Sequence, residues 1–185
     1  MDSEGNPLPE EGPFADGERY LRLMTNVEGR CVVIVAGTIN DSETMDLLDL
    51  CHKMVEAGAE EIRVVVPYFG YSTMERAVKP LEAVKAKTRA LLISSMLRGA
   101  PKASVIMLDL HSEGIQHYFD YGIKTHHVYA KPVIVESVKQ LLIKHYATSR
   151  GLTRLTKAQT AEALATPFVF ASTDTGRVKW VDSLS

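Results

Sequence analysis

The sequence has little cysteine and no long apolar run. It contains 2 cysteines in 185 residues, too few for a disulfide scaffold, so we expect Cys31 and Cys51 to be buried free thiols in a reducing compartment. No apolar run approaches the roughly 18 residues of a membrane span. The acidic, Pro/Gly-rich start also lacks the regions of a secretory signal. These absences predict a cytoplasmic protein with no membrane partner.

An excess of positive charge is missing as well. Lys and Arg number 21 against 23 Asp and Glu, which gives a formal net charge of −2. Without a positive field to displace counterions, a role in binding nucleic acid is not expected. The 45% apolar and 24% charged residues are close to soluble globular averages, so the composition predicts a packed core.

The length allows one domain and the beginning of another. Residues 1–13 are acidic and rich in proline, which predicts a flexible tail, with order beginning near Phe14. We divide the rest into a domain over residues 14–150 and a linker helix with the first strand and loop of a truncated second domain over residues 151–185.

Alternating strand and helix patterns predict an α/β fold. Runs rich in β-branched residues predict buried strands, with shorter strands at 19–24 and 127–130. The main strands are expected at 31–36, 62–66, 105–108 and 168–171. Linkers of a few residues between them indicate a parallel sheet with helices on both faces.

Helical spacing and capping residues place the predicted helices between these strands. They are expected at 43–57 after Asn40, at 80–96 with Pro80 in the first turn, at 112–119, at 132–148, and after a capping box that starts at Thr156. In the second helix the pattern assigns Val84, Leu91, Leu92 and Ser95 to the inner face.

Ligands of such sheets bind beyond the carboxyl ends of the strands, so the loops that follow the strands are the candidate site. These loops are residues 37–42, 67–79, 109–114 and 172–177. Neither a P-loop nor a Gly-x-Gly-x-x-Gly fingerprint occurs in the chain. A nucleotide would therefore have to be bound by other means.

Asp109 and His111 follow a predicted buried strand and, by strand alternation, would point to one side. A carboxylate and an imidazole there could hold Mg²⁺ or act as an acid/base pair. The alternative is a capping Asp beside a partly buried His. Asp174 follows the last predicted strand and could join them at the same edge, or be an ordinary turn residue.

Two further groups of residues have both a binding and a structural interpretation. The segment Phe-Ala-Asp-Gly-Glu at 14–18 places Phe14, Asp16 and Glu18 around a glycine turn. A ring and carboxylates suit an adenine, but Asp-Gly is also a common turn. A basic cluster could neutralise phosphates or form a solvated face. It consists of Arg76, Lys79, Lys85 and Lys87.

Residues 14–18, 63–71 and 107–120 resemble the ribose-phosphate diphosphokinase (phosphoribosyl pyrophosphate synthetase) family, in this order and with compatible spacing. The string Asp-Leu-His…Ile-Gln…Phe-Asp within 107–120 is the specific part. The resemblance covers residues 14 to about 149 and resumes at 168–176. It implies a type I phosphoribosyltransferase-like fold.

The resemblance also implies an activity. The family transfers the β,γ-diphosphoryl group of ATP to ribose 5-phosphate, which forms phosphoribosyl diphosphate for nucleotide biosynthesis, and its members form homo-oligomers. By position, His111 and Asp174 would hold Mg²⁺, while the ATP-binding set would partly serve a neighbouring subunit. That set is Phe14, Asp16, Glu18, Arg76 and Asp109.

Several positions depart from the family pattern. Thr73 and Met74 stand where the family has an Arg-Gln pair that contacts ATP, and Arg177 replaces the second glycine of the last loop. The flexible catalytic loop and the ribose 5-phosphate loop of the family would lie beyond Ser185. We therefore expect no catalytic residue within this chain and an incomplete enzyme.

Three hypotheses remain from the sequence. The first is a ribose-phosphate diphosphokinase, or a piece of one. The second is a non-catalytic associated subunit, which the loss of the Arg-Gln pair at Thr73 and Met74 favours. The third is a phosphoribosyltransferase proper, which the missing sugar-phosphate loop disfavours.

Overall fold

The structure is a computed structural model in which residues 10–171 and 181–183 are described. The chain divides into two compact units, residues 1–128 and residues 129–185.

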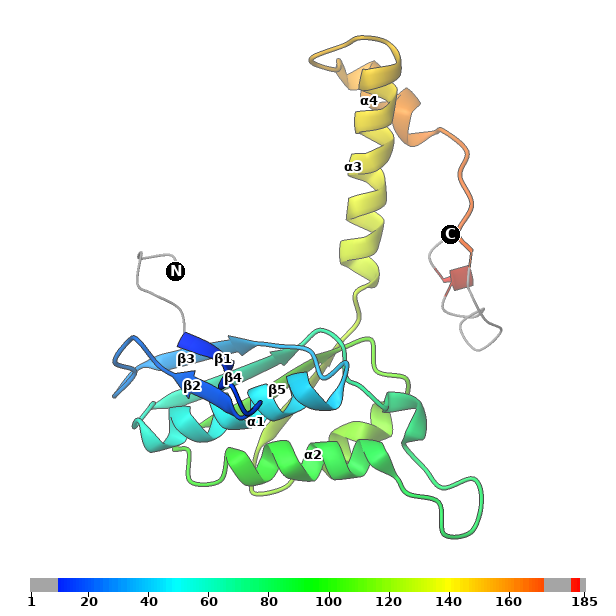
Figure 1. The fold of residues 1–185 in the computed structure, drawn as a ribbon. Coiled ribbons are helices and arrows are strands. Elements are labelled where there is room, and N and C mark those ends of the chain that lie inside the picture. Colours follow the sequence, from blue (N-terminus) through cyan, green and yellow to red (C-terminus); the bar gives the residue numbers. More distant parts are fainter. Residues whose placement is uncertain (1–9, 172–180, 184–185) are drawn as a thin grey trace. The chain divides into compact units, whose positions relative to one another are not determined.

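Unit 1 is built on a parallel sheet of four strands (Figure 1). The strands run in the order β3 (Cys31–Val35), β4 (Glu61–Val66), β5 (Ala103–Leu108) and β6 (Lys124–Val128). The predicted parallel α/β fold is therefore confirmed. The last strand begins at Lys124, three residues before its predicted start, and it ends at Val128.

Two helices, α1 (Asp41–Glu56) and α2 (Lys85–Met96), pack on one face of this sheet (Figure 1). Each crossover moves one strand further in the same direction, so right-handed connections place both helices on the same side. The sheet residues on that side form the core with them: Ile34, Ile62, Val64, Val66, Val105 and Met107. On the other side, Val33 and Val35 are 57% and 66% exposed, although β3 was predicted to be buried on both faces.

The start of α1 follows from its capping residue. The side chain of Asn40 accepts a hydrogen bond of 2.8 Å from the backbone N–H of Glu43, which satisfies one of the free donors at the helix start. Asp41 and Glu43 in the first turn also favour the positive end of the helix dipole. The predicted helix is confirmed, beginning two residues earlier than expected.

The prediction for the next helix was wrong in both its start and its inner face. α2 begins at Lys85, not at Pro80. Its buried residues are Ala86, Ala90, Ile93 and Ser94, whereas Leu91 and Leu92 are 39% and 36% exposed. The buried Ser94 is tolerated because its hydroxyl donates to the carbonyl of Ala90 and accepts from the backbone N–H of Asp120.

A hairpin precedes the sheet. β1 (Glu10–Pro13) pairs antiparallel with β2 (Arg19–Arg22), so residues 10–13 are paired, within the segment whose composition predicts a flexible tail. Arg19 joins the hairpin to α1 through Asp46 and Ser42. Pairing with β2 supplies backbone partners that composition cannot anticipate.

Unit 2 contains the helices α3 (Lys131–Ser149) and α4 (Lys157–Leu164), and α4 packs against α3. The predicted capping box is confirmed, since Thr156 and Gln159 bond reciprocally. The hydroxyl of Tyr146 donates to Glu162 at 2.6 Å, which raises the pKa of Tyr146. The strand expected at 168–171 is not formed, and Asp174 lies outside the described residues.

None of the described helices combines the length and the apolar character of a membrane span.

The two thiols occupy different environments, so the prediction that both are buried was wrong for Cys31. Cys31 is exposed, and Cys51 is buried. Burial raises the pKa of Cys51 to about 12, and only the thiolate is a nucleophile.

In dilute native protein at pH 8 we expect a disulfide reagent to modify the exposed Cys31 thiol quickly and the buried Cys51 thiol only after unfolding. Cys31→Ser should remove the fast phase, and a fast phase that survives would contradict this assignment.

Candidate functional site

The loops that follow β3 and β4 are fastened together. The hydroxyl of Thr38, a fully buried residue, accepts a hydrogen bond of 2.7 Å from the backbone N–H of Gly70. The backbone N–H of Thr38 donates to the carbonyl of Tyr68 at 3.0 Å. The contact is so close that a Cβ on Gly70 would lie 1.8 Å from the carbonyl oxygen of Thr38. This fastening fixes the positions of the two loops relative to each other.

A charged and aromatic cluster lies directly after this fastening. The Tyr71 hydroxyl donates to Asp41 at 3.3 Å, and Arg89 of α2 forms an ion pair with the same carboxylate. The Lys85 ammonium lies 4.6 Å and the Arg89 guanidinium 4.8 Å from the centroid of the Tyr71 ring. The cluster thus joins the ends of β3 and β4 to α2.

The segment after β5 leaves the sheet in an unusual conformation. The strand ends at Leu108 and Asp109 has φ 43°, so the alternation that predicted Asp109 and His111 on one side does not continue. Backbone N–H groups hold the segment to β6: that of Asp109 donates to Val128 O, and that of Leu110 donates to Nε2 of His127, both at 3.0 Å. His111 itself is exposed.

The loops after β4 and β5 are also joined. The short helix η1 (Ser72–Met74) is followed by Glu75, whose carbonyl accepts a hydrogen bond of 2.6 Å from the Tyr118 hydroxyl of η2 (Glu113–Tyr118). The rings of Phe69 and Phe119 meet edge to face with their centroids 6.2 Å apart. The segment that carries Arg76 is thereby held beside the segment that follows His111.

Arg76 is itself directed mostly into solvent. Its side chain is 79% exposed, and its Nε lies 3.6 Å from Glu75 Oε1. Exposed ion pairs of this kind contribute little to stability. The guanidinium is therefore free to turn toward an anion at this edge of the sheet.

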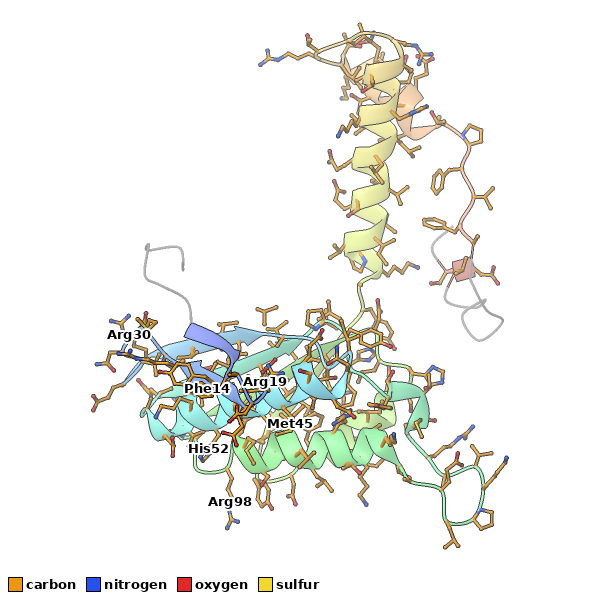
Figure 2. All side chains as sticks on the ribbon, viewed as in Figure 1. Phe14, Arg19, Arg30, Met45, His52 and Arg98 are labelled. Atoms are coloured by element: carbon orange, nitrogen blue, oxygen red, sulfur yellow. The ribbon has the colours of Figure 1, made fainter. Side chains whose placement is uncertain are left out.

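The turn of the hairpin carries the remaining described site residues, of which Phe14 is labelled in Figure 2. Phe14 is 55% exposed and contacts the ring of Tyr20 at 5.5 Å between centroids. Asp16 accepts a hydrogen bond of 3.1 Å from the backbone N–H of Glu18. Among the described residues, no hydrogen bond or ion pair joins these three predicted site residues to the segments of Arg76 or His111.

A magnesium ion was expected at this edge of the sheet. Within residues 10–171 and 181–183, no three carboxylate, imidazole or thiol side chains stand close enough to hold a metal. Mg²⁺ commonly keeps several waters and binds through one or two protein groups together with substrate phosphates. An exposed imidazole at His111 fits that mode of binding, whereas it does not fit a site made by the protein alone.

A hollow of about 570 Å³ lies elsewhere, along the turns and strand residues at the amino ends of β4, β5 and β6. It contains none of the predicted site residues. Its position is opposite to the strand ends where α/β proteins bind ligands.

Several residues that organise the site were not identified from the sequence. Thr38, Arg89 and Tyr118 lie in ordinary patterns, and only contacts between distant segments reveal their roles. His127 has a structural role, since its Nε2 accepts a hydrogen bond from the Leu110 N–H. A glycine between two aromatic residues, four residues after the end of β4, was the one signal available for the contact at Gly70.

The fold and these loops together define a parallel α/β domain that gathers polar side chains beyond the carboxyl ends of its strands, as ligand-binding α/β proteins do. Residues 9–96 match the family model described as the N-terminal domain of ribose phosphate pyrophosphokinase. Over these residues the chain is similar to the N-terminal domain of this family.

Individual relatives agree with this assignment. Ribose-phosphate pyrophosphokinase of Gloeobacter violaceus is 36% identical over 132 residues, which are 69% of this chain and 37% of the relative. That of Methanothermobacter thermautotrophicus is 33% identical over 129 residues, covering 69% of this chain and 43% of the relative. The chain thus spans about two fifths of the length of these relatives.

The fold has a counterpart among solved structures. The crystal structure of phosphoribosylpyrophosphate synthetase from Mycobacterium smegmatis matches 95% of this chain and 52% of its own, with a TM-score of 0.67 and 23% identity. At this identity the likeness concerns the fold, and it confirms the expected phosphoribosyltransferase-like architecture.

Proposed function

We propose that this chain provides the ATP-binding half of a ribose-phosphate pyrophosphokinase, the enzyme that transfers the diphosphoryl group of ATP to ribose 5-phosphate. One observation carries the proposal. β6 holds the Asp109–His111 segment, and Tyr118 holds the Arg76 segment beside it, within a domain whose relatives are named for this reaction.

Each predicted site residue has a distinct role in the proposal. His111 coordinates Mg²⁺ that arrives with ATP, together with Asp174. Arg76 and Asp109 bind the nucleotide at the edge of the sheet. Phe14, Asp16 and Glu18 reach the adenine of ATP held by a neighbouring subunit. This last role fits their exposure and their separation from His111, and it requires a homo-oligomer, which we place in the cytoplasm.

The chemistry of the reaction suits such residues. Phosphoryl transfer depends on positioning and on stabilising negative charge rather than on a protein nucleophile. Bound Mg²⁺ supplies part of that charge neutralisation. This chain's residues orient the triphosphate: Arg76 contributes a mobile cation, and the hydrogen bonds to β6 keep His111 at the end of β5. The ribose 5-phosphate site belongs to the second domain, which we place from residue 151 onward, after the domain at 14–150.

The non-catalytic subunit is the second candidate function. Thr73 and Met74 occupy η1, where a charged contact to ATP would be lost, and such a contact contributes about 1.5–3 kcal/mol. The neighbouring Arg76 offers a cation from the same loop, and the matching relatives are named as pyrophosphokinases. We therefore favour the catalytic function. Release of AMP by a full-length parent chain, supplied with ATP and ribose 5-phosphate, would distinguish the two.

Binding of ATP by the 185-residue chain tests the proposal directly. We expect saturable binding of ATP with Mg²⁺ by calorimetry, weakened by about tenfold or more in His111→Ala, because a charged contact is lost. His117→Ala is the matched control, since His117 is also an exposed histidine close by on η2, and it should bind as the wild type does. Equal binding by His111→Ala and the wild type would refute the role of His111.

A further inference from the structure

The side chain of His127 is enclosed on the core side of the sheet. His127 of β6 is in register with Met107, a fully buried core residue of β5, so the two side chains lie on the same face. The side chain of His127 is only 5% exposed, and η2 packs against β6. The ring nitrogens of a histidine in such surroundings depend on partners within the protein.

The partners of the two ring nitrogens specify the protonation state of His127. Nε2 accepts a hydrogen bond of 3.0 Å from the backbone N–H of Leu110, and a ring nitrogen that accepts a hydrogen bond cannot carry a proton itself. The imidazole is therefore neutral, with its single proton on Nδ1. Nδ1 lies 3.8 Å from Oε1 of Glu113, and a carboxylate on that side stabilises the same tautomer. The structure thus uses His127 as an acceptor, not as a cation.

The donor to His127 lies in the turn that leads to His111. Asp109 has φ 43°, a left-handed conformation that a residue with a side chain keeps only where its surroundings hold it. After this turn the N–H of Leu110 donates to the ring of His127 rather than to the backbone of β6. Leu110 is 5% exposed, so water is a poor substitute for this acceptor. Without an acceptor at position 127 the turn would leave a buried N–H unpaired.

We propose that His127 is a positioning residue of the candidate site. Its neutral imidazole sets the course of the backbone through Asp109 and Leu110, and hence the position of the His111 side chain one residue further on. His127 acts through the Leu110 backbone and need not touch the nucleotide. The consequence for ATP rests on the proposed function, because His111 is the residue proposed to bind ATP with Mg²⁺.

Two variants separate the acceptor from the bulk of the ring. His127→Phe keeps a planar ring and removes the acceptor, whereas His127→Gln supplies a side-chain carbonyl that can accept from the Leu110 N–H. In His127→Phe we expect calorimetry to show ATP binding with Mg²⁺ that is about tenfold weaker, because the segment of His111 loses its defined position. In His127→Gln the affinity should stay within about threefold of the wild type.

His126→Phe is the matched control for these variants. His126 is the preceding residue of the same strand, is exposed, and points to the opposite face by strand alternation. The same substitution at this position should therefore leave ATP binding unchanged.

Amide exchange and histidine chemical shifts test the positioning without any nucleotide. The Leu110 N–H should exchange slowly in the wild type and in His127→Gln, and at least about tenfold faster in His127→Phe. The N–H groups of Val64 and Val105, in the two inner strands of the sheet, should stay protected in all three chains, which shows that the domain remains folded. The nitrogen shifts of His127 should report a proton on Nδ1 and none on Nε2.

Three results would overturn the proposal. A proton on Nε2 in the native chain would exclude the bond from Leu110. Equal Leu110 exchange and equal His111 signals in His127→Phe and the wild type would mean that other contacts hold the segment. Equal ATP affinity in these two chains would break the link from His127 to the site. A wild-type chain that binds no ATP would refute the proposed function, whereas the nucleotide-free measurements would still decide the role of His127.

Discussion

Replacing Gly70 by alanine is expected to destabilise the domain by about 3 kcal/mol. The added Cβ would lie 1.8 Å from the carbonyl oxygen of Thr38, a backbone atom of a fully buried residue. Relief of this overlap requires the loops after β3 and β4 to separate, which also breaks the hydrogen bond from Gly70 N–H to the Thr38 hydroxyl. Urea unfolding, followed by circular dichroism, measures the loss.

Gly114→Ala is the control for this experiment. A Cβ there would meet nothing closer than the Ser112 hydroxyl at 3.5 Å, which is an ordinary contact. The midpoint of unfolding should therefore change little. If Gly70→Ala unfolded at the same urea concentration as Gly114→Ala, the two loops could not be fastened as described.

A second large loss is expected for Ile93→Ala. Ile93 is fully buried on the inner face of α2, and removing an isoleucine side chain from a packed core costs about 2–5 kcal/mol. The neighbouring Leu92→Ala removes a side chain of the same size from a residue that is 36% exposed. We expect its cost to be at most about 1 kcal/mol.

This pair of variants decides which face of α2 points to the core. The sequence pattern assigned Leu91 and Leu92 to the inner face, whereas the structure buries Ile93. Thermal unfolding of the two variants compares these assignments directly. A larger loss in Leu92→Ala than in Ile93→Ala would favour the pattern and contradict the packing.

The sheet could be predicted because each of its main strands corresponds to a short apolar stretch that is recognisable in the sequence by itself. Three of the four strands are mainly apolar runs that contain Val and Ile, and the alternation with helices specifies parallel pairing. The capping residues Asn40 and Thr156 also act within three residues of their helices, so both helix starts were near the prediction. Such features depend on neighbours in the sequence.

The inner face of α2 could not be predicted because small and polar residues form it. Ala86, Ala90 and Ser94 add little hydrophobicity, yet they let the helix lie close to its neighbours. The exposure of Val33 and Val35 had a different cause. This exposure results from the chain topology, because the two crossover connections run in the same direction and place both helices on the opposite face of the sheet. No single stretch of sequence indicates that topology.

The sequence was sufficient to predict which loops form the candidate site, but not how their side chains and backbone are arranged. Asp109 and Arg76 lie in loops that follow strands, as expected. The φ of 43° at Asp109 and the hydrogen bond from Tyr118 to Glu75 depend on segments distant in the sequence. Asp174 lies outside the described residues, and its role stays a prediction.

The attachment of the Asp109–His111 segment to β6 has a consequence for how the domain is assembled during synthesis. His111 leaves the ribosome before Lys124–Val128, yet the backbone bonds of Asp109 and Leu110 both end on β6 residues. Until this edge strand has been made and has joined the sheet, the imidazole has no defined position. A nascent chain can therefore contain every residue of the first three strands of the sheet and still lack the ordered segment that we propose binds the nucleotide.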